Sequence, residues 1–189
     1  MRKTVALFVF LALVLLAAGP TAAQTKAPAK APRPAVTTSQ ELLNAWNDVG
    51  RKLIAMAEDW PEEKYDYKPT PSVRSFAEQL LHVGGANYFF TDTALGKPLG
   101  QEDLPREKYK TRADVVAALK KSFADGAAAI QQKGDAGLAA TVKHPFANQM
   151  AHLSSIAWDL TEHAGEHYGQ LVLYYRMAGQ VPPESRPRQ

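Results

Sequence analysis

The sequence predicts an all-α protein that folds as an up-down four-helix bundle. Three observations indicate this fold class. Four segments place apolar residues at helical spacings of three and four, Gly and Pro residues separate these segments, and strand-like alternation is not evident anywhere in the chain. Amphipathic helices of this length bury their apolar stripes by packing against one another. We therefore expect one bundle domain, residues 39–185.

The first helix is expected from Ser39 to about Trp60. Thr38 and Glu41 fit a capping box at its start, and Pro61 ends it. Its apolar stripe consists of Leu42, Trp46, Val49, Leu53, Met56 and Trp60.

The second helix is expected from a capping box of Ser75 and Glu78 to about Leu95, where Gly96 and Pro98 follow. Its apolar stripe consists of Phe76, Leu80, Val83 and Phe90.

The third and fourth helices are marked by similar signals. The third starts at Thr111, with Asp114 as capping partner, and ends before Gly134. Its stripe consists of Val116, Leu119, Phe123 and Ile130. After a long glycine-rich loop, the fourth begins between residues 148 and 154. It runs to Ala178, where Gly179 supplies a left-handed stop.

The N-terminal region predicts export. Arg2 and Lys3 precede an apolar run over residues 5–18, which is shorter than the roughly 20 residues of a membrane span. We expect a secretory signal peptide at residues 1–23, a flexible Lys/Ala/Pro spacer at residues 24–38, and a secreted or periplasmic protein without a stable membrane anchor. The sequence contains no cysteine, so neither a lipid-attachment cysteine nor a disulfide is expected.

The charge of the predicted domain argues against a nucleic-acid partner. The whole chain has a formal charge of +3, but seven of its cations lie outside residues 39–184. Within that range, 15 Lys and Arg face 19 Asp and Glu, a net charge of −4. Phosphate binding needs clustered cations, so this domain is a poor polyanion binder.

Two histidines lie on the inward face of the fourth predicted helix. Counting by threes and fours along that helix gives the stripe Leu153, Ile156, Leu160, His163, His167, Gln170 and Tyr174. At a spacing of four residues, the Cβ atoms of His163 and His167 lie about 6 Å apart, so the two imidazoles can share one metal ion. The alternative is that each imidazole forms hydrogen bonds inside the core, and spacing alone leaves both interpretations open.

A third histidine completes a candidate metal site. His82 lies midway along the second predicted helix, beside the small residues Gly84, Gly85 and Ala86. Facing helices of a bundle bring such midpoints together, and three nitrogen ligands leave a fourth position for water or substrate. The remaining histidines, His144 and His152, are interpreted as structural or surface residues.

The segment H-A-G-E-H, residues 163–167, also matches the reversed zinc-peptidase pattern, in which Glu166 would activate water. That chemistry recruits a further ligand well downstream. After His167, Glu184 is the only side-chain carboxylate, which makes the peptidase the weaker interpretation.

Three stretches of the chain, residues 61–90, 119–130 and 163–185, resemble the DinB family in order and spacing. The resemblance implies a four-helix bundle that binds a divalent metal ion, commonly zinc or nickel, through His82, His163 and His167. Members of that family include transferases and isomerases that use small thiols, and hydrolase-like proteins. Small thiols are abundant in the cytoplasm, so the predicted export argues against a thiol cosubstrate.

Two functions remain open at this level. The first is a metal-dependent transferase or hydrolase acting on a small molecule, with Glu166 as proton acceptor and Asp159 orienting His163. For Glu166, a solvated carboxylate beside the site is an equal alternative. The second is a non-catalytic metal-binding or stress-related module in which the ion stabilises the bundle. A homodimer is compatible with both functions.

Overall fold

The four-helix bundle is confirmed in a computed structural model, which describes residues 36–187. The predicted signal peptide and nearly all of the predicted spacer lie outside the described residues. The secondary-structure elements are α1 (Thr38–Asp59), η1 (Glu62–Lys64), α2 (Phe76–Leu95), α3 (Arg112–Leu138), β1 (Thr141–Lys143), β2 (Met150–His152), α4 (Leu153–Met177) and η2 (Pro183–Ser185). None of the helices in this part of the chain has the length and apolarity needed to cross a lipid bilayer.

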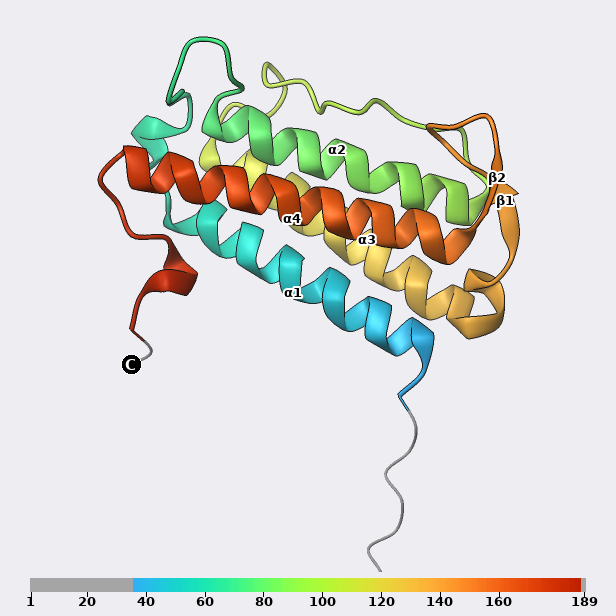
Figure 1. Cartoon of the computed structure of the whole chain (residues 1–189). Coiled ribbons are helices and arrows are strands. Elements are labelled where there is room, and N and C mark those ends of the chain that lie inside the picture. The colour runs from blue at the N-terminus through green and yellow to red at the C-terminus, as the bar shows by residue number, and fades with distance from the viewer. Residues whose placement is uncertain (1–35, 188–189) are drawn as a thin grey trace, which may run out of the picture. The chain divides into compact units, whose positions relative to one another are not determined.

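The helices are arranged so that α2 packs against both α3 and α4, and α1 packs against the same two helices from the other side (Figure 1). Helices α2 and α4 are antiparallel, whereas α2 and α3 run in the same direction. This parallel pair distinguishes the bundle from a simple up-down arrangement. It exists because the connection between α2 and α3, residues 96–111, returns along the whole length of α2 before α3 begins.

The helix starts follow the predicted capping signals with one shift. Capping boxes form at Ser75 with Glu78 and at Thr111 with Asp114. The predicted start of the first helix was wrong by one residue. Its N-cap is Thr37, whose hydroxyl accepts a hydrogen bond from the backbone N–H of Gln40, so α1 begins at Thr38.

The end of α4 agrees with the sequence, and that of α3 is more complex. Gly179 adopts the predicted left-handed conformation, with φ of 74°. At Gly134, φ is 55° and ψ is −171°, so the regular helix breaks there as predicted, and a further short helical stretch continues to Leu138.

The expectation of no strands was wrong. β1 and β2 form a short antiparallel hairpin in which Val142 pairs with Ala151. Each strand has three residues, which is too short for alternation to be visible in the sequence. The hairpin forms most of the connection between α3 and α4.

The core is formed by all four helices, and an aromatic cluster lies within it between α1, α2 and α3. The Trp46 ring contacts Phe90 and Phe123 at centroid distances of 5.6 and 5.4 Å, and its indole N–H donates to the Phe123 carbonyl at 2.9 Å. A Cβ on Gly126 would lie 2.2 Å from the Trp46 ring, so glycine is required there. The predicted stripe of α3 needs one correction, because Val115 is fully buried and Val116 only partly.

Candidate metal centre

The structure brings together the three histidines that the sequence singled out. His82 lies midway along α2, and His163 and His167 lie on the antiparallel α4. The Nε2 atom of His163 is 3.1 Å from Nε2 of His82 and 3.2 Å from Nε2 of His167. One nitrogen of each ring lies within 4.8 Å of the other two. In the part of the chain that the structure describes, this is the group of side chains placed to share a metal ion.

The tautomer of His82 is set from the loop before α3. Its Nδ1 lies 2.9 Å from Oδ1 of Asp103, which in turn lies 3.4 Å from the guanidinium of Arg74. An ionised carboxylate can only accept, so His82 donates through Nδ1. The lone pair of His82 is consequently on Nε2, the nitrogen that faces the other two rings.

The tautomer of His167 is set by a chain of hydrogen bonds that begins at a backbone carbonyl. The Tyr174 hydroxyl donates to the carbonyl of Arg74 at 2.5 Å, and therefore accepts from the Gln79 amide nitrogen at 3.2 Å. That nitrogen also donates to Oε1 of Gln170 at 2.9 Å. The Gln79 amide oxygen is thereby turned towards His167 and accepts from Nδ1 at 2.5 Å. The lone pair of His167 is again on Nε2.

His163 lies between these two lone pairs and cannot satisfy both. Its Nδ1 is buried and has no hydrogen-bond partner. If the proton is on Nδ1, three Nε2 lone pairs face one another; if it is on Nε2, only one neighbour receives a hydrogen bond and Nδ1 is left without a donor. A cation at the centre would bind all three lone pairs at once. Two ligands about 2.0–2.1 Å from one tetrahedral ion lie about 3.3 Å apart, close to the observed separations.

Burial favours the neutral form of the His163 and His167 imidazoles, as metal binding requires. Burial, reinforced by the neighbouring histidines, lowers the pKa of His167 to about 3. The pKa of His163 is also lowered, mainly by burial and then by the charge of His82. His82 and His167 are 4% and 6% exposed. The residues present therefore fit a divalent ion in donor type, protonation and separation.

Two supporting residues of this centre were missed as such by the sequence analysis. Gln79 lies three residues before His82, on the same face of α2, so this spacing could have indicated that it supports the centre. Asp103 lies in the loop of residues 96–111, and its approach to His82 depends on the path of that loop over α2. No sequence pattern marks that path except the small residues after His82, Gly84 and Gly85, which leave room for it.

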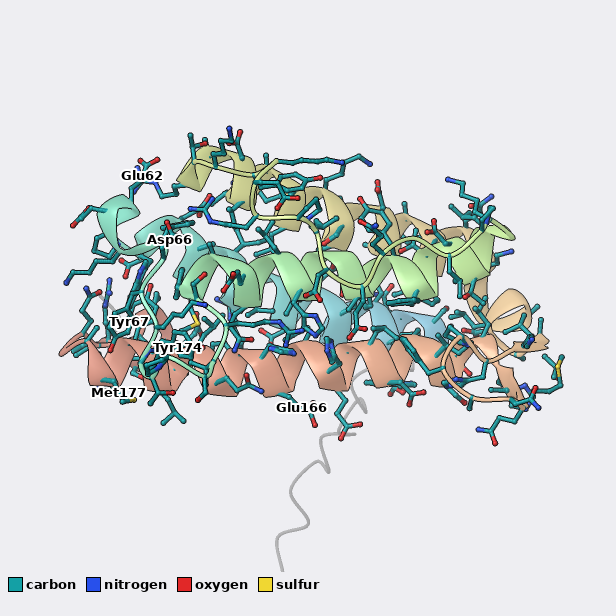
Figure 2. The ribbon with its side chains drawn as sticks, turned by 90° about the horizontal axis from the view of Figure 1, so that it is seen from above. Glu62, Asp66, Tyr67, Glu166, Tyr174 and Met177 are labelled. Atoms are coloured by element: carbon teal, nitrogen blue, oxygen red, sulfur yellow. The ribbon has the colours of Figure 1, made fainter. Side chains whose placement is uncertain are left out.

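The predicted role of Asp159 in orienting His163 was wrong. The Asp159 carboxylate lies 3.2 Å from Nε2 of His144 instead. Glu166 is exposed and lies on the side of α4 that faces away from α2 (Figure 2). It acts on the centre only at longer range, where its negative charge partly offsets the lowering of the His163 pKa that burial causes. The structure thus does not bring Glu166 together with the three Nε2 atoms.

The other two histidines are structural, as predicted. His144 Nδ1 accepts from the backbone N–H groups of Phe146 and Ala147, both at 3.1 Å. His152 Nδ1 donates to the Ala139 carbonyl at 2.7 Å.

The carboxylate that the reversed peptidase pattern would need is engaged elsewhere. Glu184 forms an ion pair of 2.6 Å with Arg51 on α1. The zinc peptidase therefore stays the weaker interpretation of residues 163–167.

Two hollows adjoin the centre through its supporting residues. One, of about 460 Å³, is lined by Arg74, Asp103 and Leu104 among others. The second, of about 310 Å³, is lined by Gln79 and Gln170 together with apolar side chains such as Tyr174 and Met177, which lie near one end of α4 (Figure 2). Each hollow thus reaches a residue that holds a histidine ring, Asp103 for His82 and Gln79 for His167, and not the rings themselves.

Fold and site together define a four-helix-bundle protein with a three-histidine candidate metal centre. The chain belongs to the DinB superfamily, whose family model matches residues 45–171. A similar solved structure is YfiT from Bacillus subtilis, described as a probable metal-dependent hydrolase with an unusual four-helix bundle topology. That match has a TM-score of 0.61 and 15% identity and covers 79% of this chain and 94% of YfiT. No match is found among curated proteins.

Proposed function

We propose that this protein is an exported, metal-dependent hydrolase or transferase that binds one divalent ion, zinc or nickel, through His82, His163 and His167. The observation that carries the proposal is the convergence of three Nε2 atoms, two of which, those of His82 and His167, are turned inward as lone pairs by outer hydrogen bonds, while Nδ1 of His163 has no partner. The description of YfiT as a probable metal-dependent hydrolase supports the same reaction class.

The ion would supply Lewis-acid chemistry, by polarising a substrate oxygen or by making water nucleophilic at neutral pH. The chain's own residues prepare the position for it. Asp103 and Gln79 hold the His82 and His167 rings with their Nε2 atoms inward. Hydrogen bonds of this kind also raise the basicity of a ligating imidazole. Catalytic zinc sites typically have three protein ligands and one position open to water or substrate, whereas structural zinc sites have four protein ligands. The three histidines match the first arrangement.

The independence of the core favours catalysis over a purely stabilising ion. Trp60 stacks on Phe76 at a centroid distance of 4.4 Å and contacts Tyr175 at 4.6 Å, and all three side chains are fully buried. The apolar core supplies large buried surfaces that do not involve the histidines. We therefore expect the bundle to stay folded without the ion.

Export and a small-molecule substrate complete the proposal. The basic and apolar residues of positions 1–23 support export. The hollows beside Asp103 and Gln79 have the dimensions of small-molecule sites.

The test combines metal removal with an activity screen. Purified protein is stripped with a chelator, and its thermal unfolding and its hydrolysis of a panel of ester, amide and phosphoester substrates are compared with those of protein reloaded with Zn²⁺ or Ni²⁺. We expect a folded stripped protein and a hydrolytic activity that returns on reloading. A stripped protein that unfolds, together with a reloaded protein inactive on the whole panel, would favour the non-catalytic metal-binding module.

A further inference from the structure

A carboxylate that the sequence analysis did not consider lies at the inward side of the histidine centre. Oε1 of Glu102 is 3.7 Å from Nε2 of His82, the nitrogen that faces His163 and His167. The next residue, Asp103, lies on the opposite nitrogen of the same ring at 2.9 Å. Within residues 36–187, these two are the carboxylates in ion-pair distance of the three histidines.

The backbone around Glu102 is placed by close packing against α2. A Cβ on Gly85 would lie 2.1 Å from the carbonyl oxygen of Glu102, so the loop touches the helix backbone one turn after His82. Beside it, Leu104 Cδ1 would lie 3.3 Å from a Cβ on Gly84. The carboxylate of Glu102 therefore reaches the centre from a segment whose position is fixed on both sides.

The two consecutive acidic residues have different partners and therefore different roles. Asp103 is bound to Nδ1 of His82 and to Arg74, so its charge is already paired. Glu102 has its nearest partner at 3.7 Å, beyond hydrogen-bond distance. Its side chain is 57% exposed and is directed to the nitrogen whose lone pair points inward.

We propose that Glu102 supplies a carboxylate donor to the divalent ion beside the three histidines, with water or substrate taking a further position as the ion expands beyond four ligands; this inference rests on the proposed metal site. Three neutral imidazoles leave the double charge of the ion uncompensated, and a carboxylate halves it. Carboxylate oxygens bind zinc at about 2.0–2.2 Å, so a bound oxygen lies about 3.4 Å from a neighbouring ligand nitrogen. The distance of 3.7 Å from Glu102 Oε1 to His82 Nε2 is close to that separation. The carboxylate lies outside the group of ligand atoms within 4.8 Å of one another, so the exposed Glu102 side chain has to rotate towards His163 and His167 to bind the ion.

The test is a Co²⁺ titration of the full protein followed by visible absorption, with the Kd for Zn²⁺ measured by competition with a chelator. Three proteins are compared: the wild type, Glu102→Gln, and the control Glu107→Gln, which changes another exposed glutamate of the same loop. We expect Glu102→Gln to bind one ion with at least about tenfold weaker affinity and a changed cobalt spectrum, while Glu107→Gln matches the wild type.

The outcomes separate this inference from the metal site itself. Equal affinity and identical cobalt spectra for Glu102→Gln and the wild type would overturn the role of Glu102 and leave the three-histidine site intact. A wild type that binds no ion would overturn both. As a second variant, Glu102→Ala should weaken Zn²⁺ binding at least as much as Glu102→Gln, with circular dichroism confirming the helical fold.

Discussion

Two histidines near α4, His144 and His163, show how hydrogen bonding separates a structural imidazole from a ligand. His144 uses both nitrogens: Nδ1 accepts two backbone N–H groups, and Nε2 bonds to the Asp159 carboxylate. It closes the turn of the β1–β2 hairpin and needs nothing further. His163 has an unpartnered buried Nδ1, and its Nε2 faces two nitrogens that also carry lone pairs.

The difference is therefore in the direction of the lone pairs and not in residue type or burial. Buried polar groups in folded proteins are nearly always satisfied, so an unsatisfied cluster needs an explanation. At the centre, the outer hydrogen bonds all orient acceptors inward, which is the arrangement that a cation would stabilise. The following predictions test that contrast, from the largest expected effect to the smallest.

Removing the central imidazole should have the largest effect. His163→Ala is expected to weaken Zn²⁺ or Ni²⁺ binding by more than about 100-fold, because a direct ligand contributes more than a supporting residue. Isothermal titration measures the affinity, and His144→Ala is the matched control, with unchanged affinity expected. Equal losses in the two variants would contradict the distinction drawn between these histidines.

Removing a residue that sets a tautomer should have an intermediate effect. Gln79→Ala takes away the acceptor of His167 Nδ1, and Asp103→Asn weakens that of His82. Each is expected to reduce metal affinity by about 10–100-fold with the one-ion stoichiometry retained. Gln131→Ala, at an exposed position of α3, is the control. Wild-type affinity in both site variants would show that these hydrogen bonds do not prepare the centre.

Acid should destabilise the metal-free protein through the same histidines. In the unfolded chain a histidine has a pKa near 6.5, whereas in the fold that of His167 is about 3 and that of His163 is also lowered. Between these values the unfolded chain binds more protons than the folded protein does. The free energy of unfolding therefore keeps its full value above pH 6.5 and decreases as the pH falls below it. The loss is at most about 1.4 kcal/mol per pH unit for each group. Urea titrations from pH 7.5 to 5 measure it, and His167→Ala should flatten the dependence.

The smallest effect is expected at the hairpin. His144→Ala leaves the Phe146 and Ala147 N–H groups without their acceptor, which costs about 1 kcal/mol because this region is partly exposed to water. Urea denaturation of the metal-loaded protein measures the free energy of unfolding. A loss above about 3 kcal/mol would mean that the hairpin is coupled to the core.

The sequence carried most of the fold and the histidines of the site because both depend on local spacing. The stripe positions from Leu42 to Trp60, the caps at Ser75 and Thr111 and the pair His163 and His167 are periodic features of single helices. By contrast, Glu102 and Asp103 reach the centre through a loop that is placed only by tertiary packing on Gly84 and Gly85.

Two carboxylates of α4 illustrate the same limit. Asp159 lies one turn before His163 on α4, which suggested a contact, yet the hairpin brings His144 to it instead. Glu166 lies between the two histidines in sequence but on the outer side of the helix (Figure 2). Spacing along a helix places a side chain on a face, and only the packed neighbours decide which partner it meets.

The central claim is that three Nε2 atoms converge because they bind one divalent ion. It is tested most directly by elemental analysis of the purified protein after equilibration with Zn²⁺ or Ni²⁺, beside the variant with His163 and His167 both changed to Ala. The account predicts about one ion per chain in the wild type and almost none in the variant. Equal metal content in the two proteins would contradict it.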